Sequence, residues 1–266
     1  MIKNRKGESE MFLPSMRLDG KNAIVTGAGR GIGRAIAIGY AEAGANVALL
    51  SRTESDLQEV AGQIERLGQK AIVIPTDVTN RKEVHRAVTA AKEKMGTIDI
   101  LVNNAGMNIR TKALEVTDEE WEKIMQTNLK SAFMCSQEAG HVMKDQNHGK
   151  IITIVSVAGQ VALRTGVVYA ATKAALIQMT KVLAFEWGQY GINVNAIGPW
   201  YFRTPLTKAL LEDEEYVRDI VAVTPLKRVG ELPELVGPAV FLASEGANYI
   251  SGQTLFVDGG MTIHGF

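Results

Sequence analysis

Short apolar runs alternate with helical segments along almost the whole chain, and this alternation is the feature that most restricts the fold. Apolar runs with β-branched residues predict seven strands, at 22–26, 46–50, 71–75, 98–102, 150–155, 192–197 and 254–257. Apolar residues spaced by three and four predict helices at 31–42, 54–67, 81–95, 119–143, 169–190 and 232–242, with short helices in 203–230. The strands are apolar throughout rather than at every second residue, which indicates a sheet covered on both faces. The sequence therefore predicts an α/β protein with a doubly wound, seven-stranded parallel sheet and helices on both faces.

One domain accounts for most of the chain. The 266 residues contain no linker or repeat, so residues 18–266 are expected to form a single domain after an N-terminal extension at 1–17. Lys plus Arg equals Asp plus Glu, at 29 each, which gives no reason to expect nucleic acid or a membrane surface as partner. A single cysteine, and no apolar run of signal or membrane-spanning length, predict a cytoplasmic location. The four histidines are scattered, so no metal site is expected.

A glycine-rich segment, Thr26-Gly-Ala-Gly-Arg-Gly-Ile-Gly33, follows the first predicted strand and opens a helix. Glycine lets the backbone approach a ligand closely, and free N–H groups at a helix start attract phosphate. After the first strand of a βαβ unit, such a segment favours a bound dinucleotide in a Rossmann-type fold. The residues expected to hold it are Gly27, Arg30, Gly31, Ile32 and Gly33.

Tyr169 and Lys173 lie four residues apart on a predicted helix and therefore share one face. An ammonium beside a phenol favours the phenolate, so Lys173 is expected to lower the pKa of Tyr169 from about 10 towards neutral. Such a phenol can exchange a proton with an alcohol or ketone oxygen. Ser156 follows the strand at 150–155, at the edge of the sheet where doubly wound proteins bind ligands.

These motifs occur together with others in a fixed order. The full set is Thr26-Gly-x-x-x-Gly31-x-Gly33, Asp77-Val78, Asn103-Asn104-Ala105-Gly106, Asn128, Ser156, Tyr169-x-x-x-Lys173, Pro199 with Thr204, and Val257-Asp258-Gly259-Gly260. Through them the sequence resembles the short-chain dehydrogenase/reductase family over residues 18–260. The resemblance implies an enzyme that transfers a hydride between a nicotinamide cofactor and an alcohol or ketone, and that assembles as a homotetramer.

The same resemblance implies a role for each of four catalytic residues. Tyr169 is expected to be the general acid/base, and Lys173 to hold the nicotinamide ribose. Ser156 is expected to donate a hydrogen bond to the substrate oxygen. Asn128 is expected to anchor a water that relays protons from Lys173. Apart from the resemblance, Asn128 is better interpreted as a helix-bend residue whose side chain is satisfied within the protein.

Further cofactor contacts are implied beyond the glycine-rich segment. Asp77 is expected to bind the adenine amino group, with the backbone of Val78 beside it. Asn104 is expected to line the cofactor cleft. The backbone of Phe202 and the hydroxyl of Thr204 are expected at the nicotinamide end.

The second predicted strand ends in Ser51-Arg52, without the acid that binds a ribose 2′-OH in NAD-selective proteins. Arg52 offers a guanidinium suited to a 2′-phosphate, and Arg30 can reach the same place. These residues favour NADP(H), with NAD(H) as the alternative and solvated surface charges as the other interpretation. Asp56 falls on the following helix and is expected to be too far along it to take part.

Within the family, the chain is most similar to gluconate 5-dehydrogenases and other sugar-acid and polyol dehydrogenases. Arg110, Trp200-Tyr-Phe-Arg-Thr204 and Gly237-Pro-Ala-Val-Phe-Leu-Ala-Ser244 carry this similarity. Arg110 or Arg203 could pair with a substrate carboxylate. Hydroxyls near the pocket mouth could bind to Asn108, Gln160 and Arg164. Each arginine could equally be a surface residue or a subunit contact. Trp200 stands where the family usually has glycine, and is expected to face the substrate and narrow the pocket.

Two other functions remain open. A 3-oxoacyl-thioester reductase acting on acyl carrier protein is similar through the same catalytic residues and Ile151-Ile-Thr-Ile154, but a neutral chain gives no support for an acidic carrier. A non-catalytic NADP-binding sensor has no need of the four catalytic residues. In either enzyme, residues 205–224 are expected to form a lid over the substrate.

Overall fold

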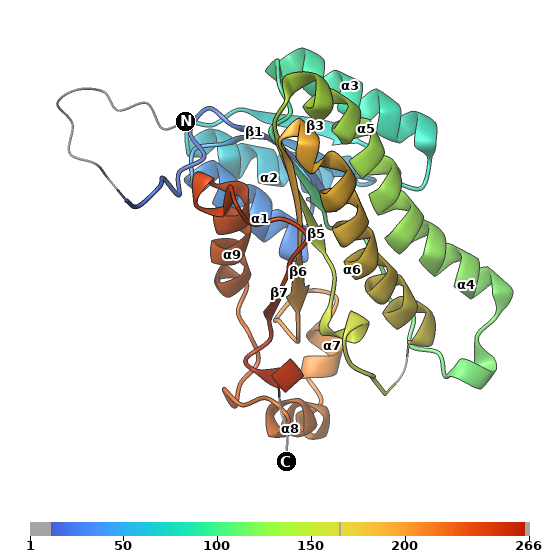
Figure 1. The fold of residues 1–266 in the computed structure, drawn as a ribbon. Helices are drawn as coiled ribbons and strands as arrows, with labels where there is room; N and C mark the ends of the chain where they lie inside the picture. Colours follow the sequence, from blue (N-terminus) through green and yellow to red (C-terminus); the bar gives the residue numbers. More distant parts are fainter. Residues whose placement is uncertain (1–11, 165, 264–266) are drawn as a thin grey trace.

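Figure 1 shows the computed structural model, which describes residues 12–164 and 166–263. Within these residues seven parallel strands form one sheet, in the order β3-β2-β1-β4-β5-β6-β7. The chain winds outward from β1 in two directions, so the order reverses between β1 and β4, and this is the predicted doubly wound fold. The strands are β1 Asn22–Thr26, β2 Asn46–Ser51, β3 Ala71–Pro75, β4 Ile100–Asn103, β5 Gly149–Ile154, β6 Ile192–Pro199 and β7 Thr254–Val257.

Helices cover both faces of the sheet, as the apolar strands require. One face packs against α1, α2 and α9, and the other against α3, α5 and α6 (Figure 1). The long helices are α1 Gly31–Glu42, α2 Glu54–Arg66, α3 Arg81–Met95, α5 Ser131–Gln146, α6 Val167–Trp187 and α9 Pro233–Ala243. The shorter ones are α4 Asp118–Ile124, α7 Lys208–Leu211 and α8 Glu214–Ala222.

The helix predicted at 119–143 is longer and less regular than expected. It consists of α4 and α5 joined by a π-helical segment, Met125–Lys130, so the helical stretch runs from Asp118 to Gln146. A π segment inside an α-helix often marks a functional position. The strand predicted at 98–102 begins only at Ile100, because the backbone of Ile98 bonds to the side-chain amide of Gln146 at 3.0 and 2.9 Å.

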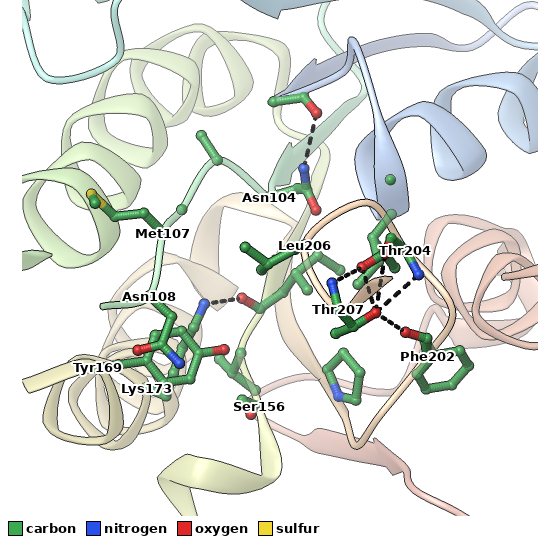
Figure 2. A pocket seen from close by; sticks show the side chains of 18 of the residues that line it. Asn104, Met107, Asn108, Ser156, Tyr169, Lys173, Phe202, Thr204, Leu206 and Thr207 are labelled. Carbon is green, nitrogen blue, oxygen red and sulfur yellow. Dashed lines mark hydrogen bonds between the residues drawn. The ribbon is translucent and has the colours of Figure 1, made fainter. Parts of the chain in front are cut away.

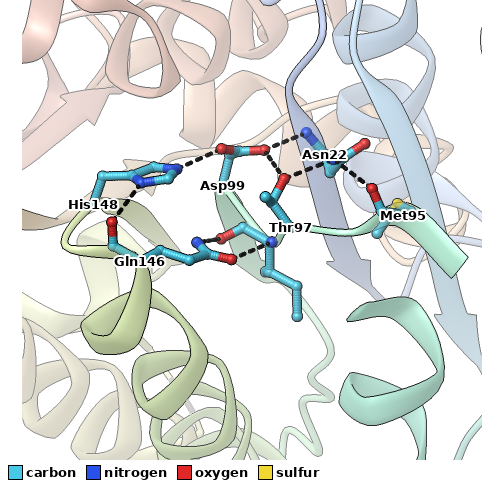
Figure 3. A network of polar contacts seen from close by, with 7 residues as sticks. Asn22, Met95, Thr97, Asp99, Gln146 and His148 are labelled. Carbon is cyan, nitrogen blue, oxygen red and sulfur yellow. Dashed lines mark hydrogen bonds and ion pairs between the residues drawn. The ribbon is translucent and has the colours of Figure 1, made fainter. Parts of the chain in front are cut away.

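A polar network ties the amino-terminal ends of the central strands together (Figure 3). The buried carboxylate of Asp99 accepts from the backbone N–H of Asn22 at 2.9 Å and lies 2.7 Å from Nε2 of His148. Asp99 therefore joins the start of β1 to the segments before β4 and β5. This network fixes the end of the sheet that lies opposite the carboxyl ends of the strands.

Helix α6 is long and apolar enough to cross a membrane by composition alone. It packs on the sheet through buried residues that include Leu176, Leu183 and the charged Lys173, and we therefore describe it as a core helix. The predicted N-terminal extension falls partly outside the described residues. Of the described part, Met16 accepts a hydrogen bond from the Ser244 hydroxyl at 3.2 Å through its sulfur.

Candidate active site

A cavity of about 1320 Å³ opens at the carboxyl ends of the strands. The loops that follow β1 to β6 line it, together with α8 and the last described residues. This is the edge at which doubly wound sheets bind ligands, because there the loops diverge on either side of the switch point. Most of the predicted site residues lie in its wall.

The glycine-rich loop after β1 forms one end of the cavity. A Cβ on Gly33 would lie 2.3 Å from the carbonyl oxygen of Gly27, so only glycine lets the start of α1 pack on the loop. Gly31 has a φ of +58°, in the left-handed region that favours glycine. No side chain caps the N-terminus of α1, so its first N–H groups are left for a phosphate. The loop therefore fits a pyrophosphate.

Two arginines and an acid lie around the end of β2. Arg30 and Arg52 both line the cavity, as does Ser51, the last residue of β2. Asp56 also lines it, and its Cβ would lie 2.8 Å from a Cβ on Gly29. The expectation that Asp56 lies too far along α2 is therefore wrong, because the first turn of α2 folds back against the glycine-rich loop.

Asp77 and Val78 follow β3 and line the same end of the cavity. Oδ1 of Asp77 accepts from the backbone N–H and hydroxyl of Thr79 at 2.9 and 2.7 Å. Burial works to raise the pKa of this carboxyl, but these hydrogen bonds and the charge of Arg52 outweigh it and hold the pKa below its usual value. Asp77 is therefore an ionised acceptor at neutral pH.

Asn104 connects the phosphate loop to the end of β4. Its Nδ2 donates to the carbonyl oxygens of Thr26 at 3.0 Å and Gly27 at 3.2 Å. Nδ2 of the preceding Asn103 points instead to the Ser136 hydroxyl, at 2.8 Å, beneath the sheet. Asn104 thus lines the cavity and fixes the loop, whereas Asn103 braces α5.

Ser156, Tyr169 and Lys173 come together in the cavity wall, at the end of β5 and on α6 (Figure 2). Lys173 is buried and its Nζ donates to the carbonyl oxygen of Ile154 at 2.8 Å. The same Nζ lies 5.4 Å from the centroid of the Tyr169 ring. The Ser156 hydroxyl accepts from the backbone N–H of Ala158 at 3.1 Å.

The pKa values of this group differ from the sequence-based expectation. Burial raises the pKa of Tyr169, against the opposing effects of the Ser156 hydroxyl and the Arg110 guanidinium. Burial also lowers the pKa of Lys173 to about 8. The expected lowering of the Tyr169 pKa is therefore not met, because loss of water disfavours the phenolate more than the nearby groups favour it. Tyr169 is a neutral phenol at pH 7 and so can donate a proton.

Asn128 lies beside the cavity rather than in its wall. Its Oδ1 accepts from the backbone N–H of Met107 at 2.8 Å, and its Nδ2 donates to the Met107 carbonyl at 2.8 Å and to the Thr172 hydroxyl at 3.3 Å. The side chain is thus satisfied within the protein, at the π segment between α4 and α5. This corresponds to the helix-bend interpretation, and the water relay through Asn128 stays a prediction.

Of the predicted substrate residues, Ser156, Arg110 and Trp200 line the cavity, whereas Gln160 and Arg203 do not. Arg203 lies outside because its Nε donates to Glu231 at 2.9 Å on the surface. Gln160 is exposed. Their assignment as substrate residues is therefore corrected.

Trp200 lines the cavity and is also hydrogen-bonded to the predicted lid segment. Its indole N–H donates to the Thr224 hydroxyl at 3.1 Å, and its ring packs edge-on against Tyr201 with centroids 4.5 Å apart. The residue that replaces the usual glycine thus connects the end of β6 to the segment after α8.

Phe202 and Thr204 also line the cavity, at the opposite side from Tyr169 in Figure 2. The Thr207 hydroxyl contacts the Phe202 carbonyl and lies 3.0 Å from the Thr204 hydroxyl. These bonds shape the backbone after β6 into a compact turn. This turn leads into residues 205–224, the predicted lid. The segment contains α7 and α8.

Two lid residues were missed at the level of sequence. Tyr216 and Asp219 on α8 line the cavity; the Tyr216 hydroxyl lies 2.6 Å from that of Tyr201, and Asp219 pairs with Arg164 at 2.7 Å. The available signal was their spacing of three, which places both on one face of a helix. Within the described residues no group of three His, Cys, Asp or Glu side chains could hold a metal.

Comparison with known proteins identifies the family. The family model described as enoyl-(acyl carrier protein) reductase matches residues 27–262, which include the glycine-rich loop, Ser156, Tyr169 and Lys173. The chain belongs to the short-chain dehydrogenase/reductase family. It is accordingly an NAD(P)-dependent oxidoreductase of alcohols and ketones.

Individual relatives within this family are similar over nearly their whole length. A tropinone reductase homolog of Arabidopsis thaliana is 42% identical over 94% of this chain and 95% of its own. The gluconate 5-dehydrogenase of Gluconobacter oxydans is 40% identical over 92% and 96%. A gluconate 5-dehydrogenase from Burkholderia cenocepacia, solved with NADP and tartrate, is 40% identical over 93% of this chain and 97% of that one, with a TM-score of 0.90.

Proposed function

We propose that this short-chain dehydrogenase/reductase is an NADP(H)-dependent sugar-acid dehydrogenase of carbohydrate metabolism, similar to gluconate 5-dehydrogenase. The observation that carries the proposal is the guanidinium of Arg110 near Tyr169. Arg110 lines the cavity, and its positive charge opposes the rise in pKa that burial gives to the hydroxyls of Tyr169 and Tyr201. An arginine in a partly buried site binds a carboxylate well. A sugar acid bound there places a hydroxyl or ketone near Tyr169.

The proposed cofactor is NADP(H), with NAD(H) as the weaker alternative. Arg30 and Arg52 line the cavity at the end of β2, where a ribose 2′-phosphate would lie. The uncapped start of α1 would hold the pyrophosphate, and Asp77 the adenine. The similar Burkholderia cenocepacia structure contains NADP, which supports the same choice here.

The chemistry follows from three side chains. NADP(H), when bound, supplies or accepts the hydride. Tyr169, neutral at pH 7, donates its phenolic proton to the ketone oxygen in reduction and becomes a phenolate. In oxidation the phenolate form takes the proton from the alcohol. Ser156 donates a hydrogen bond to the same oxygen and stabilises the negative charge that develops there. Lys173, held by the Ile154 carbonyl, would contact the ribose and orient it towards Tyr169.

The site does not favour either of the two alternatives. Several relatives are named for gluconate, a sugar acid. An acyl carrier protein would need a basic patch, and among the cations that line the cavity Arg164 is paired with Asp219 at 2.7 Å. A sensor without catalysis would not need Ser156, Tyr169 and Lys173 in one wall.

We further propose that the protein is a cytoplasmic homotetramer. Support for assembly comes from exposed apolar side chains on α5 and α6, Phe133 at 39%, Val182 at 44% and Phe185 at 90% of full exposure. Such residues on two adjacent helices favour a contact with another copy of the chain. The single cysteine, Cys135, is buried, which is compatible with a reducing compartment.

The function is tested by NADPH oxidation with 5-ketogluconate, other keto-sugars and acetoacetyl thioesters as substrates. We expect turnover with keto acids of the sugar series and none with thioesters. Arg110→Leu should raise KM for the keto acid by about tenfold or more while leaving KM for NADPH within about twofold. Preference for the thioester would refute the proposal.

A further inference from the structure

Asn108 is a polar residue of the cavity wall that the proposed reaction does not use. It lies on the loop after β4, two residues before Arg110, and lines the cavity together with Tyr169. Its Oδ1 is buried and has no hydrogen-bond partner among the described residues. Buried polar side-chain atoms almost always have a partner, so an unpaired one in a ligand cavity needs an explanation.

The position of Asn108 relative to the catalytic helix is fixed by Gly166. A Cβ on Gly166 would lie 3.1 Å from Oδ1 and 3.7 Å from Nδ2 of Asn108, and Gly166 is the N-cap residue immediately before α6. Tyr169 follows three residues later on the first turn of the same helix. Asn108 therefore lies at the end of α6 that presents the phenol, on the same side of the cavity as Tyr169 and Lys173 in Figure 2.

Four other polar side chains of the cavity wall are engaged with each other. The hydroxyls of Tyr201 and Tyr216 bond to each other at 2.6 Å, and Arg164 pairs with Asp219 at 2.7 Å. Oδ1 of Asn108 differs from them because nothing in the described protein satisfies it. A ligand group can do so.

The chemistry of the Asn108 amide restricts which functional group of a ligand can bind to it. An amide has an acceptor oxygen and a donor NH₂, and a half-turn about its last torsion exchanges the two. A hydroxyl both donates and accepts, so it can pair with the amide in either orientation. A purely apolar substrate, in contrast, would leave the buried oxygen unpaired.

We propose that Asn108 is a specificity-determining residue that binds a hydroxyl on a carbon next to the reacting carbon. The substrate is therefore a hydroxylated ketone or polyol, distinguished from a simple ketone at this position. This proposal rests on the proposed function, which supplies the sugar-acid identity of the substrate. The role of Asn108 concerns only the contact with the hydroxyl.

The test compares 5-ketogluconate with 5-oxohexanoate, the same keto acid without hydroxyl groups, in the wild type and in Asn108→Leu. Gln160→Leu is the matched control, because it makes the same change at an exposed amide outside the cavity. We expect Asn108→Leu to reduce kcat/KM for 5-ketogluconate about five- to tenfold, the effect of one hydrogen bond, with at most a twofold change for 5-oxohexanoate. The control should change neither.

Binding is measured separately, as the rise in Tm that gluconate gives to the protein loaded with NADPH. We expect a smaller rise in Asn108→Leu than in the wild type, with the Tm of the unliganded variant unchanged within a few degrees. Equal losses of kcat/KM on both ketones would overturn the proposal, because they would indicate a positioning role at the start of α6. If the wild type reduces neither ketone, the proposed function fails, and the gluconate-induced Tm alone decides: a smaller rise in the variant supports the role of Asn108, and an equal rise or none refutes it.

Discussion

Replacing the buried Lys173 by methionine should stabilise the cofactor-free protein. Burial lowers the pKa of this ammonium from 10.5 to about 8, so keeping it charged at pH 7 costs about 3 kcal/mol. Methionine removes that cost but also the hydrogen bond to the Ile154 carbonyl, which contributes about 1 kcal/mol. We therefore expect Lys173→Met to raise the free energy of unfolding by about 2 kcal/mol at pH 7.

The pH dependence identifies the cause of this gain. Between pH 8 and 10.5 the unfolded wild type keeps the Lys173 proton that the folded protein has released, so wild-type stability rises with pH across this window. The variant lacks this contribution. Its advantage of about 2 kcal/mol at pH 7 should therefore disappear by about pH 10.

Urea unfolding followed by circular dichroism, from pH 6 to 10 at one protein concentration, measures both effects. Lys181→Met is the matched control, since Lys181 is exposed on the same helix and its removal should give a small difference that does not depend on pH. If Lys173→Met is less stable than the wild type at pH 7, or if its advantage is constant with pH, the ammonium does not carry the cost of burial that we assign to it.

Three further predictions concern the cavity wall. Arg52→Glu should raise KM for NADPH about tenfold or more and leave KM for NADH within about twofold, and equal changes for both would remove Arg52 from the phosphate site. Gly33→Ala should abolish NADPH binding by fluorescence titration, since its Cβ would lie 2.3 Å from the Gly27 carbonyl; retained affinity would contradict the assigned packing. Arg203→Ala and Gln160→Leu should each keep kcat/KM within about twofold, and a larger loss would place that side chain back in the site.

The fold was predictable from sequence because its signals are local. Continuous apolar strands and helical spacing indicated the seven strands along the chain, and the glycine-rich segment after the first strand indicated a Rossmann-type fold. A predicted strand boundary was wrong where a side chain takes the hydrogen bonds that the neighbouring strand would otherwise make with the backbone. The start of β4 moved from residue 98 to Ile100 because Gln146, from another helix, bonds the backbone of Ile98.

The site was predictable where a motif fixes both residue and direction. Ser156, Tyr169 and Lys173 lie in one wall because a strand end and a helix face determine where they point. The direction of the Tyr169 pKa was not predictable, because the spacing to Lys173 says nothing about how far burial removes water from both groups.

Residues on irregular segments were harder to assign. Arg203 was selected for its charge, but an acid 28 positions later in the chain binds it at the surface. Asp56 was dismissed because of its distance along the chain, yet the turn between β2 and α2 returns it to the glycine-rich loop. Both depend on tertiary contacts that no local pattern records.

The most direct test of the central claim is the kcat/KM for NADPH-dependent reduction of 5-ketogluconate by the wild type and by Tyr169→Phe. The account predicts efficient turnover by the wild type and a loss of about a hundredfold or more in the variant, since the phenyl ring cannot donate the proton. Its affinity for NADPH should change little. Turnover that survives in Tyr169→Phe, or a wild type that reduces no sugar-derived keto acid, would contradict the account.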